Sequence, residues 1–509
     1  MAALRKDVTQ LSGSEQDRLV RGFQALMALP PSDPDSFSTI ASYHGLPGGN
    51  GVGYCQHENM LFPLWHRGYI LRLERALRKA LGDDTFAMPF WNETSPSSAQ
   101  GGLPSIFTSK TYSWSDGSGS VPNPLFSYKL QVAITDTDSE DTGKLKDLYT
   151  KPVGYETVRY PWSGIVEGTY APESQVHNAA VAELPETEIT SLLNQNIITW
   201  LTKETYTTWD KQQIPAGELD NFNACLKAPN YPVFSNTSTA GDWNDQHPSA
   251  SAAVVTPLEQ PHNAIHLAVG GYEVPSSDGS DGTLDQYPFA NGDMGENDTA
   301  AYDPVFYFHH CFIDYMFYQW QVLNDQTTTL TIPDDTLALS GVSGYSLTDD
   351  LDPFSALEVN GKNRPLQPVD IIDISTLAYS YPPVNRRLHQ EPDLNAPKLA
   401  VSNISRKDIP GSFLVTTWAK GEGNQPHRLL KIQPVLSRWD VSKCENCTKH
   451  LDVKSHVHLL DFTHEEAEKT KFFTLIHTSG VVGKDKLGDV GGIKVDLVTR
   501  GAGGAGGTA

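Results

Sequence analysis

The stretch GYCQHENMLFPLWHRGY, residues 53–69, places a cysteine two residues before a histidine and a second histidine nine residues after the first. A helix pattern begins inside it, because Pro63 suits a first helical turn and apolar residues follow at helical spacing. The stripe consists of His66, Ile70, Leu73, Leu77 and Leu81, and the residues largely off it are Arg67, Arg72, Glu74, Arg75 and Arg78. We predict a helix over residues 62–81 with His66 facing the interior.

A second segment holds a pair of histidines at helical spacing. In EQPHNAIHLAVGG, residues 259–271, His262 and His266 are four residues apart behind a proline, so a helix brings both imidazoles to one face. The glycine pair that follows ends this helix. The two side chains therefore form a chelating pair.

A third segment, DPVFYFHHCFIDYMFYQW at residues 303–320, contains two adjacent histidines. Asp303 and Pro304 are typical of a helix start, and His309 falls on the apolar stripe, so we expect it to point into the core. His310 lies about 100° further round the helix. Because of this offset, we expect that its imidazole cannot easily reach the same metal position as that of His309.

With His44, in SYHGLPGG, the sequence has six histidines at ligand-like positions, the others being His57, His66, His262, His266 and His309. A lone histidine on an apolar helix face is more often a hydrogen-bonded core residue than a ligand. Burying several imidazoles together costs free energy unless each nitrogen has a partner, and a metal supplies that partner. We therefore predict a buried metal site.

The ligand type limits the metal. Neutral imidazoles without an obligatory carboxylate suit copper or zinc better than magnesium or calcium, and they differ from the two-histidine, one-carboxylate set of non-haem iron. Residues 259–262 spell E-x-x-H, a motif of di-iron bundles, but that site needs a second copy, which the sequence lacks. Copper and zinc remain.

Charge and hydropathy exclude several classes of partner. The 509 residues carry a formal net charge of −23, which repels nucleic-acid phosphates and anionic membranes. The N-terminus has no apolar signal region, and no later window approaches the roughly 18 apolar residues of a membrane span. We expect no nucleic acid, no membrane and a cytoplasmic location. The cysteines are too scattered for a disulfide framework: Cys55, Cys225, Cys311, Cys444 and Cys447.

The pattern of the chain changes near residue 390. Before it, helix patterns mix with long loops rich in Gly, Ser and Pro; after it come short β-rich runs such as SFLVTTWA and FFTLIHTS, and the chain closes on GAGGAGGTA. We predict a mainly α domain over residues 1–390, a smaller β-rich domain over residues 391–500 and a flexible tail over residues 501–509.

Taken together, the motifs of the first 390 residues resemble those of the tyrosinase and polyphenol oxidase family of type-3 copper proteins. They are H-G-x-P at His44, C-x-H at Cys55 with a third histidine nine residues on, P-H-N-x-x-H at His262, G-D-M-G at Met294, D-P-x-F-x-x-H-H at Asp303 and Y-S-Y at Tyr379. The resemblance implies a mainly α catalytic domain, in which a four-helix bundle with long loops holds two copper ions.

The resemblance also assigns the ligands. Copper A would be held by His44, His57 and His66 and copper B by His262, His266 and His309, with His310 and Asp314 just outside them. In many members of the family the cysteine two residues before the second copper A histidine bonds covalently to its ring. A thioether between Cys55 and His57 is therefore implied; the alternative is a free buried thiol.

The implied activity, with O2 as co-substrate, is ortho-hydroxylation of monophenols and oxidation of o-diphenols to o-quinones. The substrates would be small phenols such as tyrosine, L-DOPA and catechols, as in melanin biosynthesis. Glu259 and Asn263 would hold a water that deprotonates the phenol, and Leu267 and Met294 would line the pocket. The alternatives are a catechol oxidase that acts on o-diphenols only and a haemocyanin-like O2-binding protein.

The sequence departs from the family in two places. The usual P-Y-W-D-W is PFWNE at residues 89–93, and the arginine that commonly follows the aspartate after copper B is Tyr315. Both changes concern the packing around Asp314 more than the ligands.

Long members of the family carry a β-rich C-terminal lid that keeps the enzyme latent, and RKDIPGSFLV, residues 406–415, resembles the start of one. Cys444 and Cys447 form a C-x-x-C motif that resembles a copper-loading motif of fungal members. The alternatives are a redox pair and a zinc site completed by His450, His456 and His458. Trp439 is the candidate for the side chain that plugs the mouth. A second copy of the chain and a copper donor protein stay open as partners.

Overall fold

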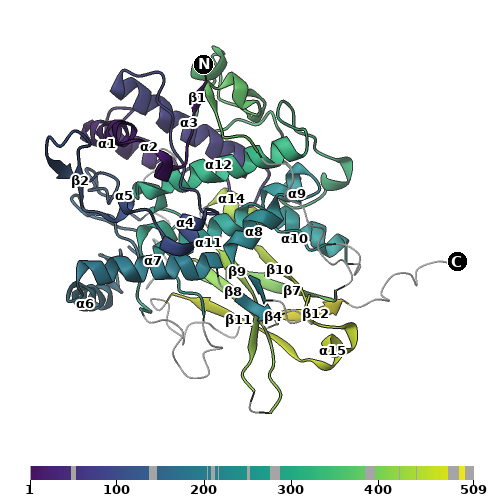
Figure 1. The fold of residues 1–509 in the computed structure, drawn as a ribbon. Coiled ribbons are helices and arrows are strands. Elements are labelled where there is room, and N and C mark those ends of the chain that lie inside the picture. The colour runs from purple at the N-terminus through teal and green to yellow at the C-terminus, as the bar shows by residue number, and fades with distance from the viewer. Residues whose placement is uncertain are drawn as a thin grey trace.

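The computed structural model describes residues 2–46, 53–136, 146–202, 204–207, 213–215, 217–248, 253–275, 287–384, 396–423, 425–442, 444–479 and 492–498. Helices dominate up to residue 384, and two sheets dominate from residue 396 (Figure 1). The fold class predicted from the sequence is therefore confirmed. The predicted domain boundary at residue 390 and the tail over 501–509 lie outside the described residues.

Thirteen α-helices are described in the first part of the chain. They are α1 (Gly13–Ala28), α2 (Phe37–Ala41), α3 (Phe62–Leu81), α4 (Pro96–Gly101), α5 (Ser105–Thr108), α6 (Ala171–Ala182), α7 (Glu186–Thr202), α8 (Glu218–Cys225), α9 (Tyr231–Ser235), α10 (Thr237–Gln246), α11 (Glu259–Gly270), α12 (Val305–Leu323) and α13 (Leu357–Asn360). The strands here are short pairs: β1 (Ala3–Leu4) with β6 (Tyr379–Ser380), β2 (Thr111–Ser113) with β3 (Ser120–Pro122), and β4 (Glu204–Thr207) with β5 (Gln213–Pro215). Among the described residues, no helix is long and apolar enough to cross a membrane.

Helix α3 has the predicted bounds and is central to the helical part. A proline lies in its first turn, and Gly82 ends it in the left-handed region at a φ of 60°, behind the basic residues of the last turn. It packs against α1 and α12. His66 is buried on it, as expected.

The charged residues of α3 differ from the expected pattern. Arg67 and Glu74 are fully buried although they lie off the apolar stripe, because other elements supply their partners. The Arg5 guanidinium donates to Glu74, and Arg67 Nε lies 2.5 Å from a carboxylate oxygen of Asp314 on α12. Amphipathic spacing alone could not reveal these distant partners.

Helices α11 and α12 each carry a pair of the predicted histidines. Every residue of α11 is buried, and the helix ends at Gly270, as expected. A Cβ on Gly270 would lie 2.0 Å from the backbone nitrogen of Gly295, so only glycine lets that segment approach the helix. Helix α12 begins at Val305, whose N–H donates to the Asp303 carboxylate.

The C-terminal part consists of two three-stranded antiparallel sheets with the orders β10-β7-β12 and β11-β8-β9. Their elements are β7 (Lys398–Ser405), β8 (Phe413–Ala419), β9 (Arg428–Val435), α14 (Glu445–Lys449), β10 (Asp452–His458), α15 (His464–Lys469), β11 (Phe472–Thr478) and β12 (Lys494–Val498). Two small apolar clusters form their interior. Strand β9 contacts α11, and β10 contacts α10, so the sheets lie against the helical part.

A buried ion network ties the N-terminus to α3 and α12. Asp314 accepts from Arg5, Arg67, Tyr379 and Tyr381. Burial alone would raise the pKa of Asp314, but the two guanidinium groups outweigh it and hold the pKa below its usual value.

We predict that Asp314→Ala destabilises the protein by about 3–5 kcal/mol, because it leaves buried positive charge without its partner. Urea unfolding of the metal-free protein measures this. The control is Asp334→Ala at an exposed aspartate, which is expected to change the stability by less than about 0.5 kcal/mol. Equal effects of the two substitutions would show that the network does not stabilise the fold.

Candidate metal centre

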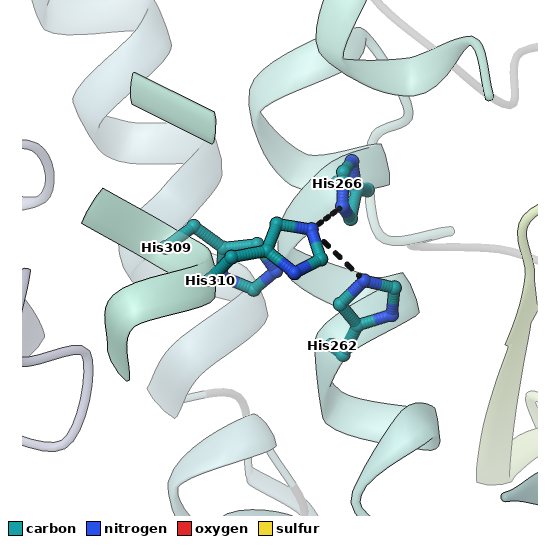
Figure 2. Close-up of side chains that lie close together, drawn as sticks. All are labelled: His262, His266, His309 and His310. Carbon is teal, nitrogen blue, oxygen red and sulfur yellow. Dashed lines mark hydrogen bonds between the residues drawn. The ribbon is translucent and has the colours of Figure 1, made fainter. Parts of the chain in front are cut away.

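The predicted histidines converge in two groups. His44, His57 and His66 form one, and the other contains His262, His266, His309 and His310; within each group the ligand atoms lie within 4.8 Å of one another. Figure 2 shows the second group, with two imidazoles from α11 facing two from α12. The groups adjoin, because the ring centroids of His57 and His262 are 5.7 Å apart.

Backbone carbonyls fix three of the imidazoles through Nδ1. His44, in the turn after α2, donates to the Asn297 carbonyl at 3.0 Å, and His66 donates at 2.9 Å to Phe62, one turn earlier on α3. His266 donates at 2.8 Å to the carbonyl of Met294, which the Gly270 contact brings close to α11.

Side chains fix two more imidazoles. His262 Nδ1 donates to the amide oxygen of its neighbour Asn263 at 2.9 Å. His309 Nδ1 lies 2.6 Å from a carboxylate oxygen of Glu93, and both side chains are fully buried. In all five cases the bond at Nδ1 leaves Nε2 as the nitrogen available to a metal.

The unused nitrogens fit a metal. Within the described part of the chain, Nε2 of His44, His57, His66 and His309 is buried without a hydrogen-bond partner. Burial lowers the pKa of these imidazoles, to about 3 for His66, and that of His266 to about 4. At neutral pH they are uncharged and present lone pairs, which is the donor set that copper or zinc takes.

The geometric expectation for His310 was wrong, whereas its place outside the copper B ligands, which the resemblance implies, stays a prediction. Its Nε2 lies 3.2 Å from Nε2 of His266 and 3.4 Å from Nε2 of His262, so it reaches the same point as its neighbour (Figure 2). The helical offset fixes only where the side chain leaves the backbone, whereas the imidazole extends from there towards α11. Its ring stacks on His66 at a centroid distance of 4.4 Å, which places it between the two groups.

The predicted water-holding pair lies on one side of α11. The Glu259 carboxylate accepts from the N–H of Glu58 at 2.8 Å and from the N–H and hydroxyl of Thr237 at 3.0 and 3.1 Å. Burial and the nearby Glu58 raise the pKa of Glu259 to about 8, against the effect of the donors. Asn263, as described, holds His262. Leu267 and Met294 are fully buried, and their role in lining a pocket stays a prediction.

Cys55 is a free, partly buried thiol beside the first group. Its sulfur accepts from the Asn297 side chain at 3.7 Å, and the carbonyl of the same asparagine orients His44. Burial raises the pKa of the thiol. The thioether to His57 stays a prediction.

The C-terminal part reaches the first group at three points. Asn446, on α14, donates to the His57 carbonyl at 2.8 Å and accepts from Asn59. Arg406 pairs with Glu58, the residue after His57. Arg438 lies 2.5 Å from Asp298, the residue after the carbonyl that holds His44.

The C-x-x-C motif is a disulfide between Cys444 and Cys447. This fits the redox-pair alternative, whereas copper loading, which needs free thiolates, stays a prediction. Among the described residues, the side chains grouped closely enough for a metal are the two histidine groups, so the structure does not bring together the residues of the alternative zinc site. His450 instead contacts Tyr345, and His456 pairs with Asp245.

Trp439 lies in the interface between the two parts. Its indole N–H donates to Glu296 at 3.0 Å, and its ring packs on Gly411, where a Cβ would lie 2.9 Å away. These contacts hold the ring beside the loop after α11, and its role as a plug stays a prediction. Sequence reasoning missed the roles of four residues: Glu93, Arg406, Arg438 and Asn446. The available signals were that Glu93 lies in PFWNE, Arg406 in the lid-start segment and Asn446 in the C-x-x-C segment, and that Arg438 directly precedes Trp439.

Comparison with known proteins gives consistent matches. A family model described as the common central domain of tyrosinase matches residues 34–323. The chain is 35% identical to a tyrosinase of Aspergillus oryzae, over 96% of this chain and 95% of that protein. A solved tyrosinase from Burkholderia thailandensis has a TM-score of 0.79 at 34% identity, over 98% of this chain and all of the other. A variant Aspergillus oryzae pro-tyrosinase, at 18% identity and a TM-score of 0.62, shares the fold over 97% of this chain and 91% of the other.

We predict that the protein, stripped of metal and titrated with copper, binds two ions per chain, and that His66→Ala binds one fewer because a buried nitrogen is lost. Metal analysis after gel filtration measures the stoichiometry. His177→Ala is the control, because this partly buried imidazole lies outside both histidine groups and, among the described residues, bonds to the Pro161 carbonyl and contacts two aromatic rings. One ion on the unaltered chain, or two on His66→Ala, would contradict the assignment.

Proposed function

Because the chain belongs to the tyrosinase family of copper oxidoreductases, which act on phenols, we propose that it ortho-hydroxylates monophenols and oxidises o-diphenols to o-quinones. The two adjoining groups of neutral imidazoles support a dinuclear copper centre. In this proposal His44, His57 and His66 hold copper A, and His262, His266 and His309 hold copper B. Bound copper supplies the activation of O2.

The observation that favours hydroxylation is the environment of Glu259. The ionised form of Glu259, which predominates once the pH rises past its pKa of about 8, has about four acceptor positions. The three donors from Glu58 and Thr237 occupy three of them and leave one for a water. Asn263 lies one turn further along α11, beside the copper B ligand His262. A water held between carboxylate and amide would take the phenol proton as the substrate enters.

We also propose that the C-terminal part, residues 396–498, is a lid that keeps the enzyme latent. Its contacts to the loops of His57 and His44, through Asn446, Arg406 and Arg438, support this role. Arg406 and Arg438 are buried, at 7% and 3% exposure. Removal of one partner of either pair would leave a buried charge without its partner, and this would destabilise the closed position of the lid.

For the water-holding role, Glu259→Gln should lower the rate on tyrosine about 100-fold relative to the rate on L-DOPA, because only the monophenol must lose its proton to the held water. Steady-state assays of the copper-loaded protein on both substrates measure the ratio. Gln260→Ala, at the next buried position of α11, is the control. An unchanged ratio would refute the role, and activity on L-DOPA alone in the unaltered protein would identify a catechol oxidase.

For the lid, Arg406→Ala combined with Arg438→Ala should raise the activity of the unproteolysed protein at least about 10-fold, because loss of a buried partner costs about 3–5 kcal/mol of lid closure. The assay is o-diphenol oxidation before and after limited proteolysis, which should abolish the difference. Arg364→Ala, which removes a partly buried pair with Asp370 within the helical part, is the control. If the unproteolysed double variant is no more active than the unaltered protein, the proposed role of the C-terminal part as a lid held by these pairs is contradicted.

A further inference from the structure

One short segment, residues 292–298, orients a histidine in each of the two groups. The Met294 carbonyl accepts from Nδ1 of His266 at 2.8 Å, and the Asn297 carbonyl accepts from Nδ1 of His44 at 3.0 Å. Every residue of this shared segment is buried. The two acceptors are three residues apart on one piece of backbone, so a displacement of the segment moves both of them.

The shared segment is fixed at both ends against the elements that carry the two histidines. At one end the N–H of Gly292 donates to the carbonyl of Gly270, the last residue of α11. At the other end the N–H of Leu46 donates to the Asp298 carbonyl at 3.1 Å. A Cβ on Gly45, the residue after the first of these histidines, would lie 2.5 Å from Cα of Asp298. The backbone therefore passes close to both ligand-bearing elements.

The C-terminal part holds the same segment from another side. The Ser412 hydroxyl donates to the Gly295 carbonyl at 3.2 Å, and the Trp439 indole N–H donates to the Glu296 carboxylate at 3.0 Å. The ion pair of Arg438, described above, is a third contact with this segment. The position of the segment thus depends on contacts from outside the helical part of the chain.

We propose that the two copper sites share residues 292–298 as one positioning element, and that Trp439 is a positioning residue that holds it in place. The inference rests on the copper site proposed above. While the outer contacts are present, the segment is already ordered for both ions. When such a contact is lost, binding of the first copper has to order the segment, and the second copper then finds it ordered. Copper binding therefore becomes weaker and more cooperative.

The test is Trp439→Phe, which keeps an aromatic ring against Gly411 but removes the indole N–H. Metal-free protein is titrated with copper in competition with a chelator, and copper per chain is measured against free copper. The variant should take up both ions in one steeper step, at a free copper concentration about 5- to 10-fold higher than the unaltered chain needs. By contrast, Asn263→Ala removes the acceptor of His262 alone and should weaken one ion only, which gives a one-copper plateau.

Trp418→Phe is the matched control, because it removes another buried indole N–H of the C-terminal part, which donates to Thr416. It should leave the copper curve unchanged. Ser412→Ala removes the donor to Gly295 and should repeat the effect of Trp439→Phe, and it replaces that variant if the latter does not fold.

The inference is overturned if neither Trp439→Phe nor Ser412→Ala shifts the copper curve, or if either variant weakens one ion alone. It is also overturned if Asn263→Ala weakens both ions in one step, because the two sites would then be coupled without the shared segment. An unaltered protein that binds fewer than two coppers would instead refute the dinuclear site itself.

Discussion

Hydrogen bonds at Nδ1 orient five of the seven imidazoles in the two histidine groups, and the geometry of the metal centre follows from them. These five histidines are turned so that Nε2 is left for a metal. The acceptors of His66 and His262 are local, whereas those of His44, His266 and His309 come from segments 28 or more positions away. The fold must therefore bring the loops of Asn297, Met294 and Glu93 against α2, α11 and α12. Without a metal the unused nitrogens would be buried polar atoms without partners, which cost free energy.

The buried charges serve the same end at longer range. Asp314, on α12, accepts a hydrogen bond from Arg67, the residue after His66 on α3. This contact connects α3 and α12, the helices that carry His66 and His309. The C-terminal part makes the same kind of contact: Arg406 pairs with Glu58, which follows His57, and Arg438 pairs with Asp298, which follows the carbonyl that orients His44. The positions of the histidines, the stability of the fold and the proposed closure of the lid therefore depend on neighbouring residues.

The three histidine-bearing helices were predictable from the sequence because local rules govern them, and the convergence of their histidines was expected from the cost of burying unpaired imidazoles and from the family resemblance. A proline in the first turn and a glycine at the end mark α3, and four-residue spacing on α11 pairs its histidines. The acceptors at Nδ1 were not predictable, since a backbone carbonyl has no sequence signature. The position of His310 depends on side-chain rotation, and the burial of Arg67 depends on Asp314 almost 250 positions away, which no periodicity records.

Anomalous scattering at the copper edge from crystals of the copper-loaded protein would locate the metal directly. Two peaks per chain are expected, one bounded by Nε2 of His44, His57 and His66 and the other by Nε2 of His262, His266 and His309. A single peak, or a peak at Cys444 and Cys447 with the histidine groups empty, would contradict this assignment.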